Sequence, residues 1–253
     1  MILASGALLG LAFATSSIAS PAGIDPDADK ILKSMSTYLG SLSAFSTNAD
    51  LDTEVIDLNG QKIQLSSSSN ILIERPGKLY ARRQGVVIDA ELIFDGKRLT
   101  LFGKDHNVYY QLEKSGTVDD VIDALRTNIG LDAPGADLMY VDSYSGLTAD
   151  VTSSAYLGTA FVDGVECHHL TFRQPKVDWQ LWVKAGDEPL PMKYVITTKW
   201  LTGAPQYSAR FRDWNTEPQI DAKQFVFTPP EGARRLQEIA VDEFGEPIMG
   251  EEK

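Results

Sequence analysis

The sequence predicts a mainly β protein in which a curved antiparallel sheet encloses an apolar interior beneath helices. Most of the chain after residue 44 alternates with a period near two, and turn signals such as Asn59-Gly60 and Asp163-Gly164 separate the segments. Strands do not alternate with helices, which argues against a parallel sheet. Residues 71–73 and 92–94 are apolar on both faces of their strands, so both faces of the sheet must be covered. Two amphipathic helices are available as covers.

The first residues have the pattern of a secretory signal. Residues 2–14 form a short apolar core, and Ser17 and Ala19 have the spacing that a signal peptidase requires. The run is too short and too rich in small residues to be a comfortable membrane span. No basic residue precedes Lys30, which leaves the true start codon open. We expect residues 1–19 to be cleaved and the mature protein to reside in the periplasm.

The first helix is predicted to begin at Asp25-Pro26, because aspartate is a good N-cap and proline fits the first helical position. Apolar residues then recur at helical spacing. They are Ala28, Ile31, Leu32, Met35, Leu39 and Leu42.

Six strands are expected next, before the chain reaches Ser115. Their predicted ranges are 44–58, 61–75, 78–84, 88–94, 98–102 and 107–112.

A second helix is expected over residues 117–130. Thr117 is the predicted N-cap, with Asp120 three residues later. One apolar stripe follows at helical spacing, formed by Val118, Val121, Ile122, Leu125 and Ile129. A further short helical turn is expected within residues 135–144.

The remaining strands are predicted at 154–162, 165–174, 177–184, 190–201 and 206–215, with a last short strand at 225–227. Short turns between successive strands predict an antiparallel meander of about eleven strands. No repeat or linker marks a boundary, so we expect one domain over residues 25–233. Residues 234–253 are predicted to be a flexible acidic tail.

Charge and cysteine content exclude several classes of function. The formal net charge is -12, so the long-range field opposes binding to nucleic acid. The single cysteine, Cys167, cannot form an intrachain disulfide, so stability must come from packing.

The segment Cys167-His168-His169 resembles a metal site in composition only. On a strand, Cys167 and His169 share one face while His168 points to the other, so adjacent ligands cannot converge. A metal would need further ligands, such as Glu166 or His106, in a tetrahedral arrangement. We favour a buried thiol beside hydrogen-bonded imidazoles, and we expect neither metal nor cofactor.

No pattern points to catalysis. The segment 143–146 lacks the leading glycine of a nucleophile elbow and does not lie between a strand and a helix. Catalysis would require His106, His168 or His169 to approach a serine or the cysteine. We expect no enzymatic activity.

Aromatic residues concentrate in three consecutive strands, and two interpretations remain open. They could form an ordinary core, which we favour for any one ring, or the floor of a ligand pocket. Trp179 and Leu181 share one face of their strand, while Trp182 lies on the other. The residues concerned are Trp179, Trp182, Tyr194, Trp200, Tyr207, Phe211 and Trp214.

Three segments resemble the landmarks of the periplasmic lipoprotein carrier LolA, in the same order. They are residues 73–76 (IERP), 95–99 (DGKRL) and 225–232 (FVFTPPEG). Further segments are even more similar to a group of predicted periplasmic proteins, domain of unknown function 2092, related to the LolA and LolB carriers. These are residues 167–170 (CHHL), 177–182 (VDWQLW) and 205–207 (PQY).

The resemblance implies an incomplete barrel of the LolA type, with helices as a lid over a cavity that takes acyl chains. It also implies that Arg75 bonds to the lid and holds it closed, a role that suits the donor-rich guanidinium. The chain departs from the carriers in its longer segment before residue 154 and in its tryptophan-rich strand, so lipoprotein cargo is not implied with the fold.

We therefore expect a non-catalytic, monomeric periplasmic carrier of a lipid, an acylated protein or another hydrophobic ligand, with transient membrane contact and no nucleic-acid partner. The alternative is an envelope interaction or regulatory scaffold with the same fold. The residues expected to line the cavity or to hold the lid are Arg75, Ile73, Leu79, Leu92, Phe94, Val121, Leu125, Leu138, Met139, Trp179 and Leu181. The ligand itself is left open.

Overall fold

The computed structural model describes residues 23–131, 133–241 and 247–248. The predicted signal peptide at residues 1–19 lies outside the described residues, as does part of the predicted tail. None of the helices in the described ranges is long and apolar enough to cross a membrane.

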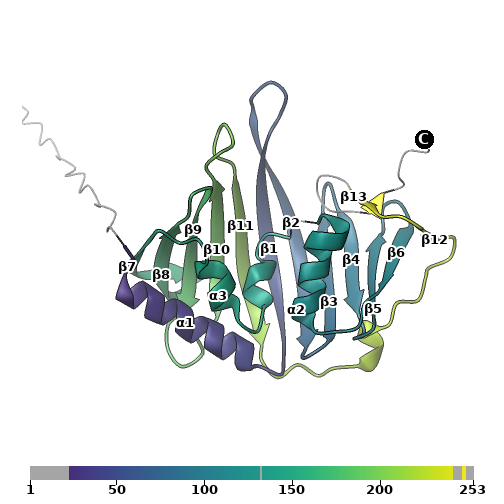
Figure 1. Ribbon diagram of the computed structural model, residues 1–253, viewed down its shortest axis with the longest axis horizontal. Coiled ribbons are helices and arrows are strands. Elements are labelled where there is room, and N and C mark those ends of the chain that lie inside the picture. The colour runs from purple at the N-terminus through teal and green to yellow at the C-terminus, as the bar shows by residue number, and fades with distance from the viewer. Residues whose placement is uncertain (1–22, 132, 242–246, 249–253) are drawn as a thin grey trace, which may run out of the picture.

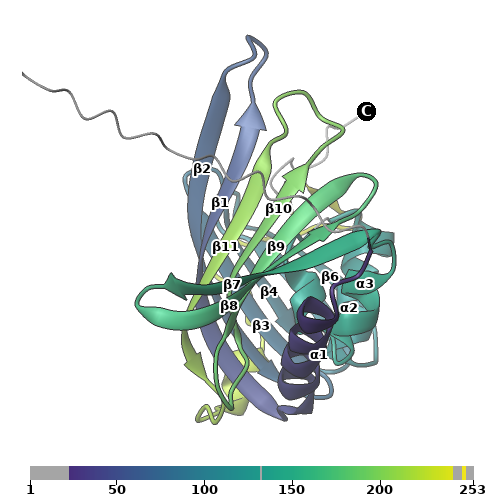
Figure 2. The same cartoon turned by 90° about the vertical axis from the view of Figure 1, so that its left-hand side faces the viewer.

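Within these ranges, twelve strands form one open, curved sheet (Figures 1 and 2). Its order is β12-β6-β5-β4-β3-β2-β1-β11-β10-β9-β8-β7, so β12 and β7 lie at the two ends and the barrel does not close. The fold class predicted from the sequence is therefore confirmed. The first run comprises β1 (Ala44–Ile56), β2 (Lys62–Glu74), β3 (Lys78–Gly85), β4 (Asp89–Phe94), β5 (Arg98–Gly103) and β6 (Val108–Glu113). The second comprises β7 (Ser153–Val162), β8 (Val165–Arg173), β9 (Val177–Lys184), β10 (Pro191–Thr198) and β11 (Gln206–Asn215).

The sheet contains two antiparallel meanders instead of the single one predicted. They join where β11 pairs with β1, in a register that places Leu51 opposite Ala209. The two-residue strand β12 (Arg234–Arg235) pairs in parallel with β6, so the sheet continues just beyond residue 233. A small hairpin of β13 (Ala240–Val241) and β14 (Pro247–Ile248) follows.

Helical segments cover the concave side of the sheet (Figure 2). Helix α1 (Pro26–Ser41) begins at the predicted N-cap, because the Asp25 carboxylate accepts hydrogen bonds from the backbone N–H groups of Asp27 and Ala28. Helix α2 (Val118–Ala124) begins with a capping box between Thr117 and Asp120. It continues through a π-helical turn, η1 (Leu125–Ile129), and ends at Gly130, whose φ of 73° suits glycine.

Two shorter helices complete the cover. The predicted turn is a 3₁₀ helix, η2 (Ala136–Met139), and a short helix α3 (Ser143–Thr148) follows it. Helix α1 approaches this segment closely at Gly40, where an added Cβ would lie 2.2 Å from the carbonyl oxygen of Val141. Only glycine permits this approach, which fixes one end of α1 against the segment between η2 and α3.

The predicted strand at 225–227 is wrong. Residues Ala222–Phe225 form a 3₁₀ helix, η3, because Asp221 and Gln224 make a capping box. The chain then runs along the convex side of the sheet, where Phe227 packs against Phe102 and Tyr109. This segment provides the second cover that the apolar strands require. The helices, which we expected in that role, cover the concave face.

Candidate functional site

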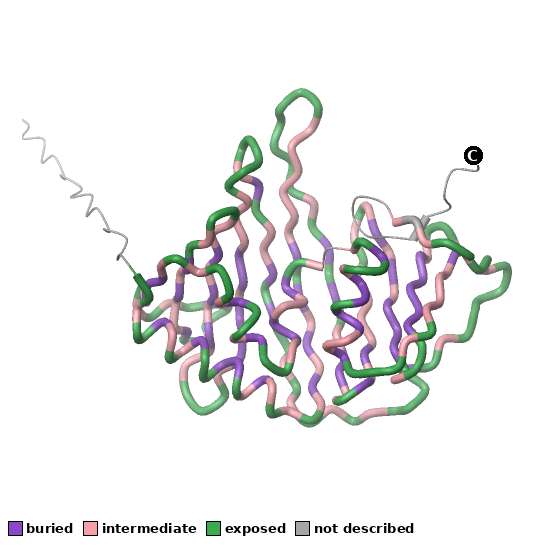
Figure 3. The backbone as a smooth tube through the Cα atoms, in the orientation of Figure 1, coloured by how far each residue is buried: buried purple, intermediate pink, exposed green. Residues whose placement is uncertain are grey.

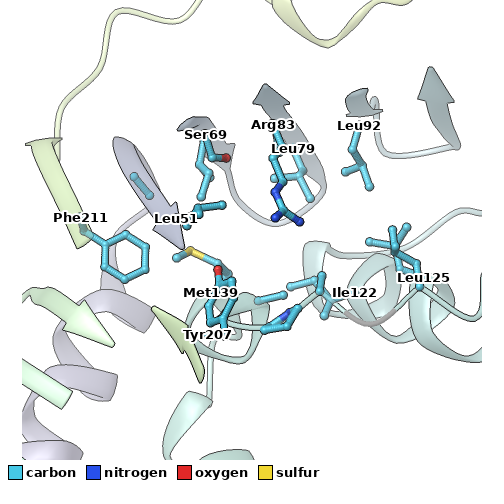
Figure 4. A pocket seen from close by; sticks show the side chains of 18 residues that line it. Leu51, Ser69, Leu79, Arg83, Leu92, Ile122, Leu125, Met139, Tyr207 and Phe211 are labelled. Atoms are coloured by element: carbon cyan, nitrogen blue, oxygen red, sulfur yellow. The ribbon is translucent and has the colours of Figure 1, made fainter. Parts of the chain in front are cut away.

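An apolar cavity of about 180 Å³ lies between the concave face of the sheet and the helical cover (Figure 4). Strands β1 to β4 and β11 supply one wall, and α2, η1, η2 and the connection before η2 supply the other. The residues that line it are Ala49, Leu51, Ser69, Ile71, Leu79, Ala81, Arg83, Leu92, Ile122, Leu125, Leu131, Ala133, Pro134, Gly135, Ala136, Met139, Tyr207 and Phe211.

The cavity follows from strand alternation combined with small side chains. Leu79, Ala81 and Arg83 are two residues apart on β3, so all three point to the concave face. Ile122 and Leu125 lie three residues apart on the helical segment opposite, and they face the sheet (Figure 4). Because Ala49, Ala81 and Ala136 are too short to meet across the gap, the interior is not completely filled.

Polar groups gather at one end of the cavity. The Arg83 guanidinium donates from Nε to Ser67 Oγ at 2.9 Å and from Nη2 to Thr53 Oγ1 at 3.3 Å. Tyr207 and Ser69 also line the cavity. Burial raises the pKa of Tyr207 to about 12, and the nearby Arg83 opposes part of this shift. The phenol is therefore neutral at physiological pH and can donate a hydrogen bond.

Arg75 joins the sheet to the cover. Its Nη2 donates to the carbonyl oxygen of Met139, the last residue of η2, at 2.8 Å. Its Nη1 lies 3.7 Å from Asp119 Oδ1 of α2, and its guanidinium carbon is 5.8 Å from the centre of the Phe45 ring. Among the described residues, buried Nε and Nη1 have no hydrogen-bond partner. Burial lowers the pKa of Arg75, while Asp119 opposes the shift.

A polar network holds the helical segments of the cover together. Arg126 of η1 donates to Tyr140 Oη at 3.3 Å and pairs with Asp137 of η2. Tyr140 Oη in turn donates to Asp123 Oδ1 at 2.7 Å. Burial, followed by the bond to Asp123, raises the pKa of Tyr140, so this donor stays protonated. These contacts link α2, η1 and η2.

The structure brings together some of the residues predicted for the site and separates others. Leu79, Leu92, Leu125 and Met139 line the cavity, and Arg75 contacts the cover. The others lie in the packed core beside the cavity: Ile73, Phe94, Val121, Leu138 and Leu181 are fully buried, and Trp179 is 2% exposed. Their part in ligand binding stays a prediction.

Trp179 belongs to a stacked core, the interpretation that we favoured for the aromatic residues. Its ring lies 3.9 Å from that of Phe172, nearly parallel to it, and Tyr194 meets its edge at 5.9 Å. Trp179 also borders a second hollow of about 340 Å³. Ala133 and Pro134 border both this hollow and the cavity, so the two spaces lie on either side of these residues.

Several cavity residues were not predicted, and the missed signals differ. Arg83 could have been found, because a two-residue period places it on the face of Leu79 and Ala81. Tyr207 and Phe211 were named only under the pocket-floor interpretation of the aromatic residues, which we did not favour, because their place at the cavity depends on the pairing of β11 with β1.

His168, His169 and Cys167 have structural partners. Cys167 is fully buried, its Sγ lies 3.4 Å from the Val165 carbonyl oxygen, and burial raises the pKa of its thiol. His168 Nδ1 lies 3.0 Å from Tyr156 Oη. His169 Nε2 lies 3.0 Å from Gln180 Oε1, and its ring stacks on Trp182. The described residues contain no cluster suited to a metal ion. The buried thiol and bonded imidazoles agree with our interpretation.

Ser143, in the segment considered for a nucleophile elbow, has a structural hydrogen bond. It lies in the first turn of α3, and its hydroxyl donates to Ser36 Oγ of α1 at 2.9 Å. This buried bond holds α3 against α1.

Comparison with solved structures identifies relatives in fold. An uncharacterized conserved protein from Thermus thermophilus shares 9% identity, with a TM-score of 0.50 over 83% of this chain and 98% of that one. The lipoprotein LppX from Mycobacterium tuberculosis shares 14% identity, with a TM-score of 0.49 over 78% and 100%. A LolA superfamily protein from Nitrosomonas europaea shares 11%, with a TM-score of 0.41 over 79% and 97%. At these identities the likeness to the Thermus protein concerns the fold alone.

Comparison of sequences identifies the family. No curated protein matches the chain. The family profile described as predicted periplasmic protein (DUF2092) matches residues 28–238, from the first helix to the segment beyond β12. This confirms the family that the sequence motifs indicated. The chain therefore belongs to the DUF2092 family of predicted periplasmic proteins.

Proposed function

We propose that the protein is a non-catalytic periplasmic carrier that holds the hydrocarbon part of a lipid or acylated ligand in the cavity between sheet and helices. The partly vacant apolar cavity supports this proposal most directly. Apolar surface buried there contributes about 25 cal/mol per Å², so even one acyl chain gains several kcal/mol before ordering costs.

The size of the cavity requires the cover to move. Its volume of about 180 Å³ is close to that of an engineered cavity of about 150 Å³ that takes a benzene molecule. Sites for larger ligands have about 300–1,000 Å³. The closed form therefore admits a short piece of hydrocarbon. A complete acyl chain needs more room, and displacing the cover beside Ala133 and Pro134 would join the cavity to the second hollow.

Arg75 is the proposed latch of this cover. Opening requires its bond to Met139 to break, after which water can solvate the guanidinium. Two guanidinium nitrogens have no hydrogen-bond partner among the described residues, which makes the closed state less favourable than a fully bonded latch would. A latch of this kind can close over a ligand and still release it.

Exposed apolar side chains suggest how the carrier meets a membrane. Leu58 is fully exposed at the tip of the β1–β2 hairpin, and Trp200 and Leu201 are 68% and 41% exposed in the β10–β11 connection. These connections project from the same end of the sheet (Figure 1), and Figure 3 shows their exposure. Tryptophan and leucine suit the membrane interface, and a net charge of -12 favours zwitterionic lipid there. We propose transient membrane contact through these tips.

The proposal includes export, with residues 1–19 as a cleaved signal. Native mass spectrometry of protein purified from the periplasm tests both points. The expected mass is that of a chain lacking the signal, accompanied by a lipid adduct. A bare chain that captures a protein partner in its place would support the scaffold alternative.

A filling substitution tests the cavity itself. Ala81→Trp adds an indole to the concave wall, so it should abolish binding of a fluorescent fatty acid. Ser66→Trp adds the same ring on an exposed position of β2 and should leave binding intact. Equal binding by both variants, with both folded, would contradict the cavity as the binding site.

A further inference from the structure

Two tyrosines lie on neighbouring strands at the place where the cavity approaches the second hollow. Tyr194 of β10 borders the hollow, and Tyr207 of β11 lines the cavity. Because Tyr194 pairs with Ala209, two residues along β11 from Tyr207, both side chains point to the same face of the sheet. Gly135 of the cover lies against both, since an added Cβ there would be 3.5 Å from Tyr207 Oη and 4.0 Å from Tyr194 Cδ1. The two rings therefore meet the cover at the same point.

Neither phenol has a hydrogen-bond partner in the described part of the chain, although Tyr194 is only 3% exposed. A buried tyrosine hydroxyl normally has a partner, because an unmade hydrogen bond in the interior is costly. Within the described ranges, the sealed polar atoms that lack a partner belong to Arg75 alone. The hydroxyls of Tyr194 and Tyr207 therefore open onto the hollow and the cavity, where they can donate to a ligand.

Both phenols keep their protons at physiological pH. Burial raises the pKa of Tyr207 to about 12. Burial also raises the pKa of Tyr194, an effect to which Asp137 adds and which Arg126 opposes. The two hydroxyls are therefore neutral donors. A carbonyl oxygen suits such a pair, because its two lone pairs can accept both hydrogen bonds.

The spaces on the two sides of the phenols differ in chemistry. The cavity is predominantly apolar, whereas polar side chains of Arg126, Asp137 and Gln174 border the hollow. A carboxylate accepts several hydrogen bonds, so Asp137 can accept from hydroxyl groups of a ligand while it stays paired with Arg126. The cavity therefore suits a hydrocarbon chain, and the hollow suits a neutral group rich in hydroxyls.

We propose that the ligand is an acyl ester of a polyol, such as an acylglycerol, whose ester carbonyl oxygen accepts hydrogen bonds from Tyr194 and Tyr207. An ester carries its carbonyl group between an acyl chain and an alcohol, which matches donors placed between two different spaces. The acyl chain then occupies the cavity, and the polyol occupies the hollow beside Asp137. This inference rests on the proposed carrier function and on the displacement of the cover that joins the two spaces.

The experiment compares three ligands of one chain length by isothermal titration calorimetry. Monododecanoylglycerol carries the ester, the dodecyl ether of glycerol has a methylene group in place of the carbonyl, and methyl dodecanoate has the ester without the polyol. We expect the glycerol ester to bind about 5- to 150-fold more tightly than the ether, which is the range for two neutral hydrogen bonds. It should bind about 2- to 10-fold more tightly than the methyl ester, which is the range for one.

The double variant Tyr194→Phe, Tyr207→Phe removes both donors and keeps both rings. Its ratio of ester affinity to ether affinity should fall to about one, and a general change in packing cancels in this ratio. Each single variant should lower the ratio about 2- to 10-fold, so the test holds even where the double variant fails to fold. Tyr109→Phe is the matched control, because Tyr109 packs against Phe227 on the convex side, and it should keep the parent ratio. Thermal denaturation verifies that the variants are folded.

The outcomes separate this inference from the function on which it rests. Equal affinity of the parent protein for the glycerol ester and its ether, or an unchanged ratio in the phenylalanine variants, would overturn the role of the phenols and leave the carrier proposal intact. Equal affinity for the glycerol ester and the methyl ester would overturn the polyol. Failure of all three ligands to bind would contradict the carrier proposal itself, and this inference with it.

Discussion

The substitution Arg75→Leu should loosen the helical cover without unfolding the protein. In the closed form, Arg75 provides the hydrogen bond to the Met139 carbonyl oxygen and faces Asp119. Leucine offers neither contact. The cover should therefore open more often, and a bound ligand should be released faster.

Two opposing contributions set the magnitude. Met139 is 5% exposed, and leaving a buried acceptor without its donor costs about 1–3 kcal/mol. The substitution also removes two buried nitrogens that have no hydrogen-bond partner in the described part of the chain, which offsets part of this cost. We expect the first contribution to dominate. In the parent protein, Nη1 lies 3.7 Å from the Asp119 carboxylate, and this attraction already offsets part of the cost of burying the nitrogen without a hydrogen bond. The net loosening of about 1–2 kcal/mol corresponds to about a 5- to 30-fold larger opening constant.

Native-state hydrogen exchange measures this opening directly. Amides of α2 and η1 should exchange about 5- to 30-fold faster in Arg75→Leu, while those of the central strands stay unchanged. Arg98→Leu is the control, since Arg98 forms an exposed ion pair with Glu113. Unchanged or slower exchange in the cover would refute the latch.

Two further predictions concern how the cover is anchored. Gly40→Ala should destabilise the protein by about 1–3 kcal/mol in thermal denaturation, because the new Cβ would meet the Val141 carbonyl oxygen. Gly146→Ala, where an added Cβ meets nothing within 4 Å, should be neutral or slightly stabilising, and an equal loss in both would contradict the close approach. Asp25→Ala should cost about 0.5–2 kcal/mol at neutral pH, because it removes the N-cap of α1 and the acceptor for the Tyr156 N–H group. Hydrogen bonding, first from Tyr156, lowers the pKa of Asp25 below 3.8, so its contribution is present above that pH and is lost as the pH falls through the folded-state value. Denaturant titrations should show that the free energies of unfolding of the parent protein and of Asp25→Ala converge as the pH falls. A difference that stays constant with pH would argue against this role of Asp25.

Local patterns predicted most of the elements. The eleven longer strands lie within three residues of their predicted bounds, because period-two alternation and glycine turns mark each one. Asp25 and Thr117 located the helix starts, because their side chains bond to backbone groups nearby in sequence.

Elements that depend on distant contacts were missed. Helix α3 has only six residues and includes Gly146, and it is held by the bond from Ser143 to Ser36, which are 107 residues apart. Residues 225–227 have high strand propensity, but the capping box at Asp221 and the contacts of Phe227 place them across the sheet instead of within it.

The same distinction applies to the site. Leu79 and Leu125 were predicted because strand and helix periods assign each a face. The β11 wall depends on a pairing between positions such as Leu51 and Ala209, which no local pattern reveals. Arg83 was overlooked because a charged residue was not expected on an inner wall.

Diffraction from crystals grown with a fatty acid brominated near the end of its tail tests the central claim most directly. The account predicts an anomalous bromine peak between Leu79 of the sheet and Leu125 of the cover, with the helices displaced from their closed position. A bromine peak elsewhere on the molecule, with the cavity closed and unchanged at saturating ligand, would contradict it.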